Sequence, residues 1–174
     1  MANLTSNPWS LTSTDPATAP ITGATGLTLN ADGTVTITTT APLTFNATAQ
    51  SNLAFTVIGA ANAVYNGLYN RVAGASGAVS FIMAPATPIA AGTAQSGGGT
   101  LAEVLYRDKI RVEDISWQNA AAAGNSLDLR DRFGNIVWQA TATGAGAQNR
   151  GKIFWIAGLT PITITAGIVL ITVN

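Results

Sequence analysis

The sequence predicts an all-β protein that combines a small β-domain with a C-terminal antiparallel β-sandwich of jelly-roll type. Apolar and polar residues alternate at many places along the chain, as strands with one buried face require. Turn dipeptides such as Asp32-Gly33 separate these alternating runs, and such dipeptides are a strong hairpin signal. The only helix-favouring run, residues 120–123, ends at Gly124 and is too short to hold a helix by itself.

A charged stretch organises the second half of the chain. Ile110 and Val112 alternate with charged residues, Asp114 breaks the alternation, and Ile115 and Trp117 resume it one residue out of step. A single extra residue in a strand has this effect, because it turns the following side chains to the other face. The pattern therefore predicts one long strand with a β-bulge near Asp114.

A β-hairpin is predicted directly after this strand. Leu127 and Leu129 share one face of a strand, and residues 132–135 form a turn in which Gly134 accepts a positive φ at little cost. Residues 136–138 return as the partner strand. We expect this hairpin to form one wall of the sandwich.

Three parts of the chain are distinguished by composition. Residues 1–22 hold three prolines among Ser, Thr and Ala, which predicts an extended N-terminal arm. Residues 23–103 are expected to form the small β-domain and residues 104–174 the β-sandwich. The Gly-rich segment 84–99 is a linker or a long loop.

The charge distribution supports a boundary near residue 103. The chain has eight basic and eight acidic residues, and only Asp15, Asp32 and Arg71 precede Glu103. Further strands are predicted within both domains, at residues 27–29, 34–40, 43–45, 53–58, 67–72, 79–83, 153–156, 162–165 and 168–173. The run 153–156 is apolar on both faces and should be central, whereas residues 158–161 should form a turn.

The composition excludes several function classes. Cysteine and histidine are absent, so thiol chemistry and the usual serine–histidine triad cannot be assembled. Charged residues make up 9% of the chain and balance to zero, which gives no reason to expect nucleic acid or a membrane as partner. The sequence has no secretory signal pattern and no apolar run long enough for a membrane span. We expect no cofactor, no metal and no catalytic residues.

A neutral surface rich in Thr, Ser, Asn, Ala and Gly favours assembly with other proteins. Burying such a surface leaves few charges without a partner, so binding should lose little affinity at high salt. The alternative that composition leaves open is an extracellular β-protein with an uncharged, hydroxyl-rich face.

Two patterns that could carry chemistry have simpler explanations. Residues 146–152 match the first seven positions of a phosphate-binding loop, but Ile153 stands where Ser or Thr should bind magnesium. Acidic residues could supply a glycosidase pair, and Asp128, Asp131 and Asn135 could offer oxygen ligands to calcium. Basic residues lie within two positions of most of these carboxylates, as in ion pairs on a solvated sheet face.

Five residues are candidates for contact with a partner. Trp9 in the arm could dock on a neighbour or, with equal weight, fold back on its own domain. Tyr65 and Tyr69 flank a glycine turn and are candidates for surface contact with a protein or a sugar. Arg130 and Arg132 belong to the charged hairpin and could fix the register in which the chain binds its partner. The three tryptophans on apolar strands are expected in the core: Trp117, Trp138 and Trp155.

Two segments resemble β-modules of virion structural proteins of tailed phages. In residues 53–102 the resemblance is carried by Phe55-Thr-Val-Ile-Gly-Ala60, Val64-Tyr-Asn-Gly-Leu-Tyr69, Val79-Ser-Phe-Ile-Met83, Pro85-Ala-Thr-Pro88 and Gly99-Thr-Leu101. The usual opening turn with His-Gly is missing. Residues 109–174 are similar to the C-terminal sandwiches of small capsid-associated proteins, through the order Asp131…Gly134-Asn-Ile-Val-Trp138 followed by Gly158-Leu-Thr-Pro-Ile162.

The resemblance implies a non-enzymatic virion protein on the capsid exterior. The expected role is a capsid decoration (cement) protein that assembles as a homotrimer and bridges and stabilises subunits of the major capsid protein. The alternative is a receptor- or glycan-binding fibre or head-spike module, and a further alternative is a carboxylate hydrolase.

Overall fold

The predicted all-β fold class is confirmed. A computed structural model describes residues 7–15, 17–45, 53–146, 149–151 and 155–174. It is 56% strand and 2% helix, with two antiparallel sheets, one of them a curled half-barrel. The one short helix among the described residues is the single 3₁₀ turn η1 (Ala63–Tyr65).

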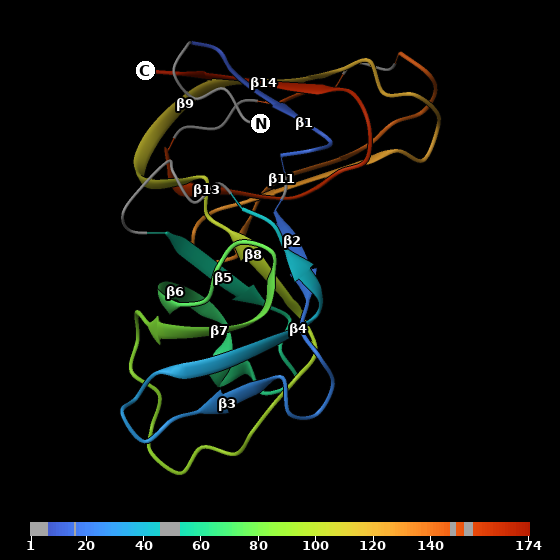
Figure 1. Cartoon of the computed structure of the whole chain (residues 1–174). Helices are drawn as coiled ribbons and strands as arrows, with labels where there is room; N and C mark the ends of the chain where they lie inside the picture. The colour runs from blue at the N-terminus through green and yellow to red at the C-terminus, as the bar shows by residue number, and fades with distance from the viewer. Residues whose placement is uncertain (1–6, 16, 46–52, 147–148, 152–154) are drawn as a thin grey trace. The chain divides into compact units, whose positions relative to one another are not determined.

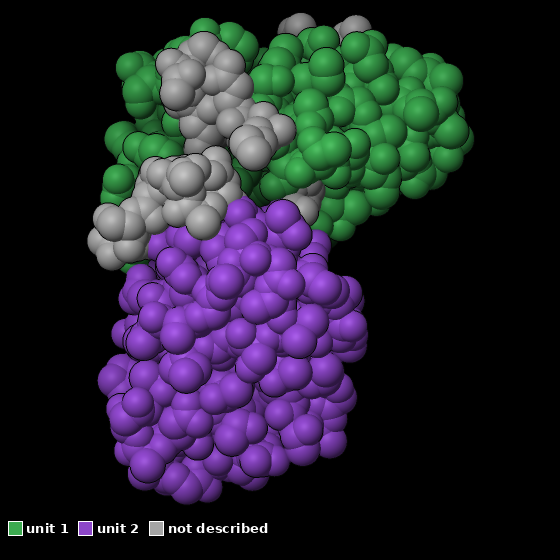
Figure 2. Space-filling view, viewed as in Figure 1, with its two compact units in different colours: residues 1–16, 105–131, 135–174 green, residues 17–104, 132–134 purple. Residues whose placement is uncertain are grey.

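The chain divides into two compact units (Figure 2). Unit 1 comprises residues 1–16, 105–131 and 135–174, and unit 2 comprises residues 17–104 and 132–134. The division between residues 104 and 105 lies beside the position at which the charge distribution changes. Each unit has its own sheet and its own apolar core.

Unit 2 is a seven-stranded antiparallel sheet in the order β2-β8-β5-β6-β7-β4-β3 (Figure 1). Its strands are β2 (Thr18–Pro20), β3 (Leu27–Leu29), β4 (Val35–Leu43), β5 (Ala54–Ile58), β6 (Gly67–Ala73), β7 (Ala78–Pro85) and β8 (Thr100–Glu103). The sheet curls back on itself, because Ile21 after β2 forms a β-bridge with Thr39 of β4. Thr22 N–H also donates to the Thr38 carbonyl at 2.9 Å.

The predicted Asp-Gly hairpin joins β3 to β4. Asn30 N–H donates to the Thr34 carbonyl at 2.8 Å, and Gly33 has a φ of 82°. Leu27 pairs with Ile37, and both side chains are fully buried. Of the alternating residues in these two strands, the leucine, valine and isoleucine side chains therefore face the core.

The Gly-rich segment is a long loop of unit 2 and not a linker between the units. It connects β7 to β8, which belong to the same sheet. Leu27 and Ser96 exchange two backbone hydrogen bonds of 2.8 and 3.0 Å, so the loop pairs locally with β3. Ser96 and Gly97 are buried there.

Unit 1 is built around the long strand β9. Its strands are β1 (Trp9–Thr12), β9 (Tyr106–Gln118), β10 (Ser126–Arg130), β11 (Ile136–Thr141), β12 (Asn149–Gly151), β13 (Trp155–Ile164) and β14 (Ile168–Val173). The order is β1-β14-β9-β13-β10-β11, and β12 also pairs with β9. One edge of β9 pairs with β14, and both strands are labelled in Figure 1. The other edge pairs with β13 and then with β12.

The predicted bulge in β9 is confirmed, one residue earlier than the break in the alternation. Thr172 pairs with Asp114 and Val173 with Val112, which leaves Glu113 as the extra residue. Val112 and Ile115 are buried on either side of it. Trp117 is fully buried and its indole N–H donates to the Ala166 carbonyl at 2.8 Å.

The predicted hairpin β10–β11 is also confirmed, whereas the predicted turn at residues 158–161 is wrong. Leu127 and Leu129 are buried, and Gly134 in the hairpin turn has a φ of 89°. Strand β13 runs through residues 158–161, because Gly158, with a φ of 85°, forms a bulge between Ala157 and Leu159. A Gly-Leu-Thr-Pro sequence has the composition of a turn, but cross-strand pairing on both edges keeps it extended.

The prediction of a separate N-terminal arm is wrong for the described residues 7–15 and 17–22. Strand β1 pairs with β14, and β2 pairs with β8. Trp9 is 6% exposed, and its ring centroid lies 4.9 Å from that of Tyr106. The Asp15 carboxylate accepts hydrogen bonds from the Thr12 N–H and hydroxyl and closes the turn after β1. Trp9 therefore packs on its own unit, which was the second of the two interpretations.

Trp9→Ala should lower the free energy of unfolding by about 3–5 kcal/mol, since it leaves a cavity in the core of unit 1. Urea denaturation followed by circular dichroism measures the change. The matched control is Ser13→Ala, an exposed position in the following turn, which should change stability by less than about 0.5 kcal/mol. A Trp9→Ala variant as stable as the control would contradict the packing of β1.

Candidate functional site

A row of neutral side chains crosses the outer side of the sheet in unit 2. Thr28 of β3 pairs with Thr36 of β4, Thr36 with Ile82 of β7, and Ile82 with Ala73 of β6. Directly paired residues point to the same face of a sheet. The residues next to them in sequence point inward, and Phe81 is buried. We call this surface the threonine face and define it as Thr28, Thr36, Thr38, Ala73, Ser80 and Ile82.

The threonine face combines hydroxyl and apolar groups. Ile82 is 39% exposed, and Val72, the extra residue of a bulge beside Ala73, is 59% exposed. Threonine is β-branched, so it favours the strand while offering a neutral outer surface. The surface therefore presents methyl and hydroxyl groups and no charge.

One charged residue lies within strands β3, β4, β6 and β7, and its charge is held locally. Arg71 donates from Nη1 to the Gly74 carbonyl at 2.6 Å. Its guanidinium carbon lies 5.7 Å from the ring centroid of Phe45, a buried residue. A partner that covers the outer side of these strands would therefore have little charge to desolvate.

The turn beside this face is fixed by polar side chains. Thr34 donates from its hydroxyl and its N–H to Asp32 Oδ1, at 2.6 and 2.9 Å. These hydrogen bonds lower the pKa of Asp32, the side-chain bond being the larger cause. Asn30 Nδ2 donates to the hydroxyls of Thr34 and Thr36, at 2.9 and 3.1 Å. The end of the threonine face thus has a defined shape before any partner binds.

The predicted exposure of Tyr65 and Tyr69 is wrong. Tyr65 is fully buried and Tyr69 is 2% exposed. The Tyr69 hydroxyl donates to the Tyr65 carbonyl at 2.7 Å, and the Tyr65 hydroxyl donates to the Ala94 carbonyl at 3.1 Å. Burial raises the pKa of Tyr69. Backbone acceptors within reach of the hydroxyls allow both rings to enter the core, so neither offers a platform for a sugar.

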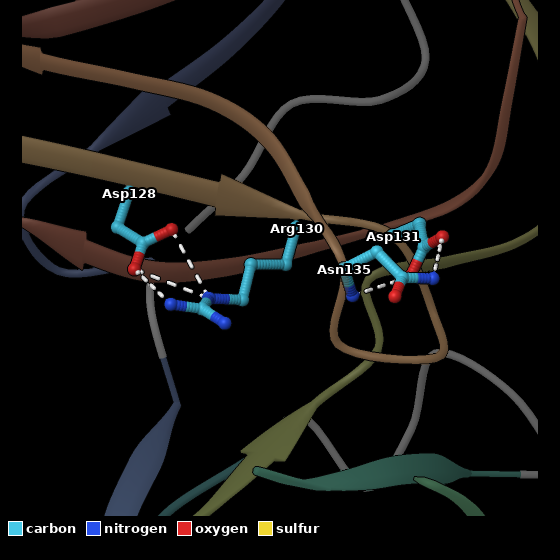
Figure 3. A network of polar contacts seen from close by, with 4 residues as sticks. All are labelled: Asp128, Arg130, Asp131 and Asn135. Carbon is cyan, nitrogen blue, oxygen red and sulfur yellow. Dashed lines mark hydrogen bonds and ion pairs between the residues drawn. The ribbon is translucent and has the colours of Figure 1, made fainter. Parts of the chain in front are cut away.

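The hairpin residues form pairs within unit 1 (Figure 3). Arg130 binds the Asp128 carboxylate, with Nη2 at 2.9 Å from Oδ2 and Nε at 3.2 Å from Oδ1. The Asp131 carboxylate accepts from the Asn135 N–H and Nδ2, both at 2.9 Å, and so closes the hairpin turn. Asp128 is therefore the ion-pair partner of Arg130 within β10, and Asp131 is part of the hairpin turn. Within the described residues no group of three or more potential metal ligands of the His, Cys, Asp or Glu type is present.

The last hairpin candidate, Arg132, belongs to unit 2 by its contacts. Its guanidinium carbon lies 4.9 Å from the ring centroid of Phe133, which is 46% exposed. The structure places Arg130 in an ion pair and Arg132 against an aromatic ring, so the two basic side chains have different surroundings.

Trp155 is an exposed aromatic that the sequence placed in the core. It is 58% exposed, whereas Trp117 is buried as expected and Trp138 is half-buried. Strand β13 buries Ile156 instead, and the Lys109 ammonium lies 4.8 Å from the centroid of the Trp155 ring. When every residue of a strand is apolar, the sequence does not show which alternate side chains face inward. Trp155 faces outward because it pairs with Arg111, on the charged face of β9.

Glu103 is a buried acid that composition did not reveal. It is 8% exposed at the end of β8, where it pairs with Phe55. Burial raises the pKa of Glu103 to about 7. The apolar neighbours Leu101 and Val104 were the available signal, but a charged residue at a strand end is usually exposed.

No protein-family model, curated protein or solved structure matches this chain. In the described part of the chain, no helix has the length and apolar character needed to cross a membrane.

The buried carboxyl makes stability depend on pH. The pKa of Glu103 is about 7 in the folded chain and 4.5 in an unperturbed one, so the folded chain binds the proton more tightly. The free energy of unfolding should therefore be highest below pH 4.5 and fall by about 3 kcal/mol as pH rises to 7 and beyond, other groups apart. Urea denaturation of Glu103→Gln across this range should lack that fall. Glu113→Gln, at an exposed position, is the control and should keep it.

Tyr69→Phe should cost about 1–3 kcal/mol of stability, because it leaves the Tyr65 carbonyl without its buried donor. Tyr106→Phe is the control, since no hydrogen bond of its hydroxyl occurs within the described residues. Equal denaturation midpoints for the two variants would show that the Tyr69 hydroxyl does not hold the turn.

Proposed function

We propose that this chain is a non-enzymatic virion structural protein, a capsid decoration (cement) protein that bridges and stabilises subunits of the major capsid protein. The observation that carries the proposal is the neutral threonine face, which spans four paired strands of unit 2. The sequence resemblance to tailed-phage virion proteins gives the class of partner and the location, the capsid exterior.

Contact through the threonine face would stabilise a complex mainly by removing surface from water. A stable protein interface covers roughly 800 Å² on each partner, and apolar area contributes about 25 cal/mol per Å² before ordering costs. Hydroxyl groups at outward positions can donate to or accept from a partner without the desolvation cost of an ion. Such an interface requires no charge pairing in unit 2.

The arrangement of the site changes the mechanism expected from the sequence. Trp9 is part of the unit 1 core, so it is not proposed as a clamp on a neighbour. Tyr65 and Tyr69 are likewise left out, because their rings are buried. Arg130 and Arg132 remain proposed contributors to register, and a homotrimer remains the proposed assembly.

Ile82→Lys should weaken binding to undecorated capsids at least tenfold, because it would place an unpaired charge within a neutral interface. The measurement is co-sedimentation of the variant with undecorated capsids of the phage that encodes the chain. The matched control is Val64→Lys, which changes a residue of unit 2 that is 54% exposed in η1, away from the threonine face.

Wild-type protein that stays in the supernatant at saturating concentration would refute the proposed function. Equal capsid binding by both lysine variants would instead remove the threonine face from the interface. Sedimentation velocity on the free protein decides whether the 17.7 kDa chain forms the proposed trimer.

A further inference from the structure

Trp155 projects from the outer side of the sheet in unit 1. It begins β13 and pairs directly with Arg111 of β9, while the next residue, Ile156, pairs with Ile110 and is buried with it. Alternate residues of a strand point to opposite faces, so the indole lies on the side away from the core. Pairing with β9 gives this part of the strand a fixed position.

Two basic residues surround the exposed indole. Lys109 pairs with Ala157 on the same face, and its ammonium lies 4.8 Å from the centroid of the Trp155 ring. Arg111, which is exposed, lies directly across from Trp155. On the far side of Arg111 along β9, Glu113 accepts a hydrogen bond of 2.9 Å from Asn174 Nδ2. The positive charge is therefore concentrated at the indole and ends at Glu113.

This combination differs from a scattered apolar residue on a surface. Tryptophan and arginine are the residue types most enriched among the side chains that dominate protein–protein binding energy. An indole with one cation near its ring and a second directly across the ladder offers one apolar contact and two charged donors on the same face. Charge complementarity then requires carboxylates on the partner.

We propose that Trp155, Lys109 and Arg111 form a binding site for an acidic protein surface, on which an apolar side chain is flanked by carboxylates. The apolar side chain packs against the exposed part of the indole, and the carboxylates accept hydrogen bonds from Lys109 and Arg111. The inference rests on the proposed function and names the chemistry by which unit 1 recognises a capsid protein.

An acidic protein surface fits this site better than an acidic polysaccharide. Sugars stack on the faces of aromatic rings, and the Lys109 ammonium already occupies one face of the indole. An aliphatic side chain needs no free ring face and can pack against any exposed part of the indole, which is 58% exposed.

The test compares capsid co-sedimentation of three variants with that of the wild type. Trp155→Ala should weaken binding at least tenfold. The neutral threonine face should bind with little salt dependence, so any salt dependence of the wild type should come from the exposed charges of Lys109 and Arg111. The double variant Lys109→Gln and Arg111→Gln should therefore bind more weakly than the wild type at low salt, and equally at low and high salt. Ile136→Ala is the matched control, because Ile136 is 57% exposed in the same unit but lies on β11, and it should bind as the wild type does.

Each outcome decides the matter. If wild type binds capsids and both the Trp155 and the double variant bind equally well, the site is refuted while the proposed function stands. If wild type does not bind, the proposed function fails, and this inference fails with it. Binding of hyaluronan but not of neutral dextran, lost in Trp155→Ala, would replace the protein partner by an acidic polysaccharide.

Discussion

The pairing of β9 on both of its edges is the constraint on which unit 1 depends. Over its 13 residues this strand joins β14 on one side to β12 and β13 on the other. Ile110 and Val112 face the core from even positions, whereas Ile115 and Trp117 face it from odd positions. Both sets can be buried in one strand only because Glu113 is an extra residue in the ladder. Without it, one half of β9 would turn its apolar side chains to solvent.

The same register determines what unit 1 shows to solvent. With Ile110 inward, Lys109 and Arg111 must point outward, and the partner strand must present Trp155 beside them. In unit 2 the outward positions of β3 and β4 are instead threonines. β-branched threonine supports the strand without adding charge. The chain therefore carries a neutral surface on one unit and an aromatic, basic surface on the other.

Local patterns were sufficient to predict much of this fold. Alternation located β9 and its bulge, and the glycines at 33 and 134 located two hairpin turns through their positive φ. These features depend on neighbouring residues only. Local patterns fail at Gly158, where the sequence is typical of a turn. Pairing with β9 and β10 keeps β13 extended there. Whether glycine forms a turn or a bulge depends on strands distant in sequence.

The candidate site was harder to predict, because exposure depends on tertiary partners. Tyr65 and Tyr69 are expected outside because they flank a glycine turn, yet backbone carbonyls inside unit 2 accept hydrogen bonds from both hydroxyls. Trp9 was expected in a loose arm, and pairing of β1 with β14 buries it. Trp155 was expected inside, and the phase of β13 exposes it. In each case the sequence shows the residue type, but the environment of the side chain is set by residues far away in the chain.

Under the proposed function, the two surfaces would divide the work of recognition. A neutral face such as that of Thr36 and Ile82 contributes affinity through area and discriminates weakly among apolar partners. Charged and aromatic groups contribute more to specificity, since a mismatched charge costs several kcal/mol. The pair of Lys109 and Arg111 around Trp155 would therefore select the partner, and the threonine face would hold it. A neutral chain needs such a selective element, because its remaining surface has little with which to reject a wrong partner.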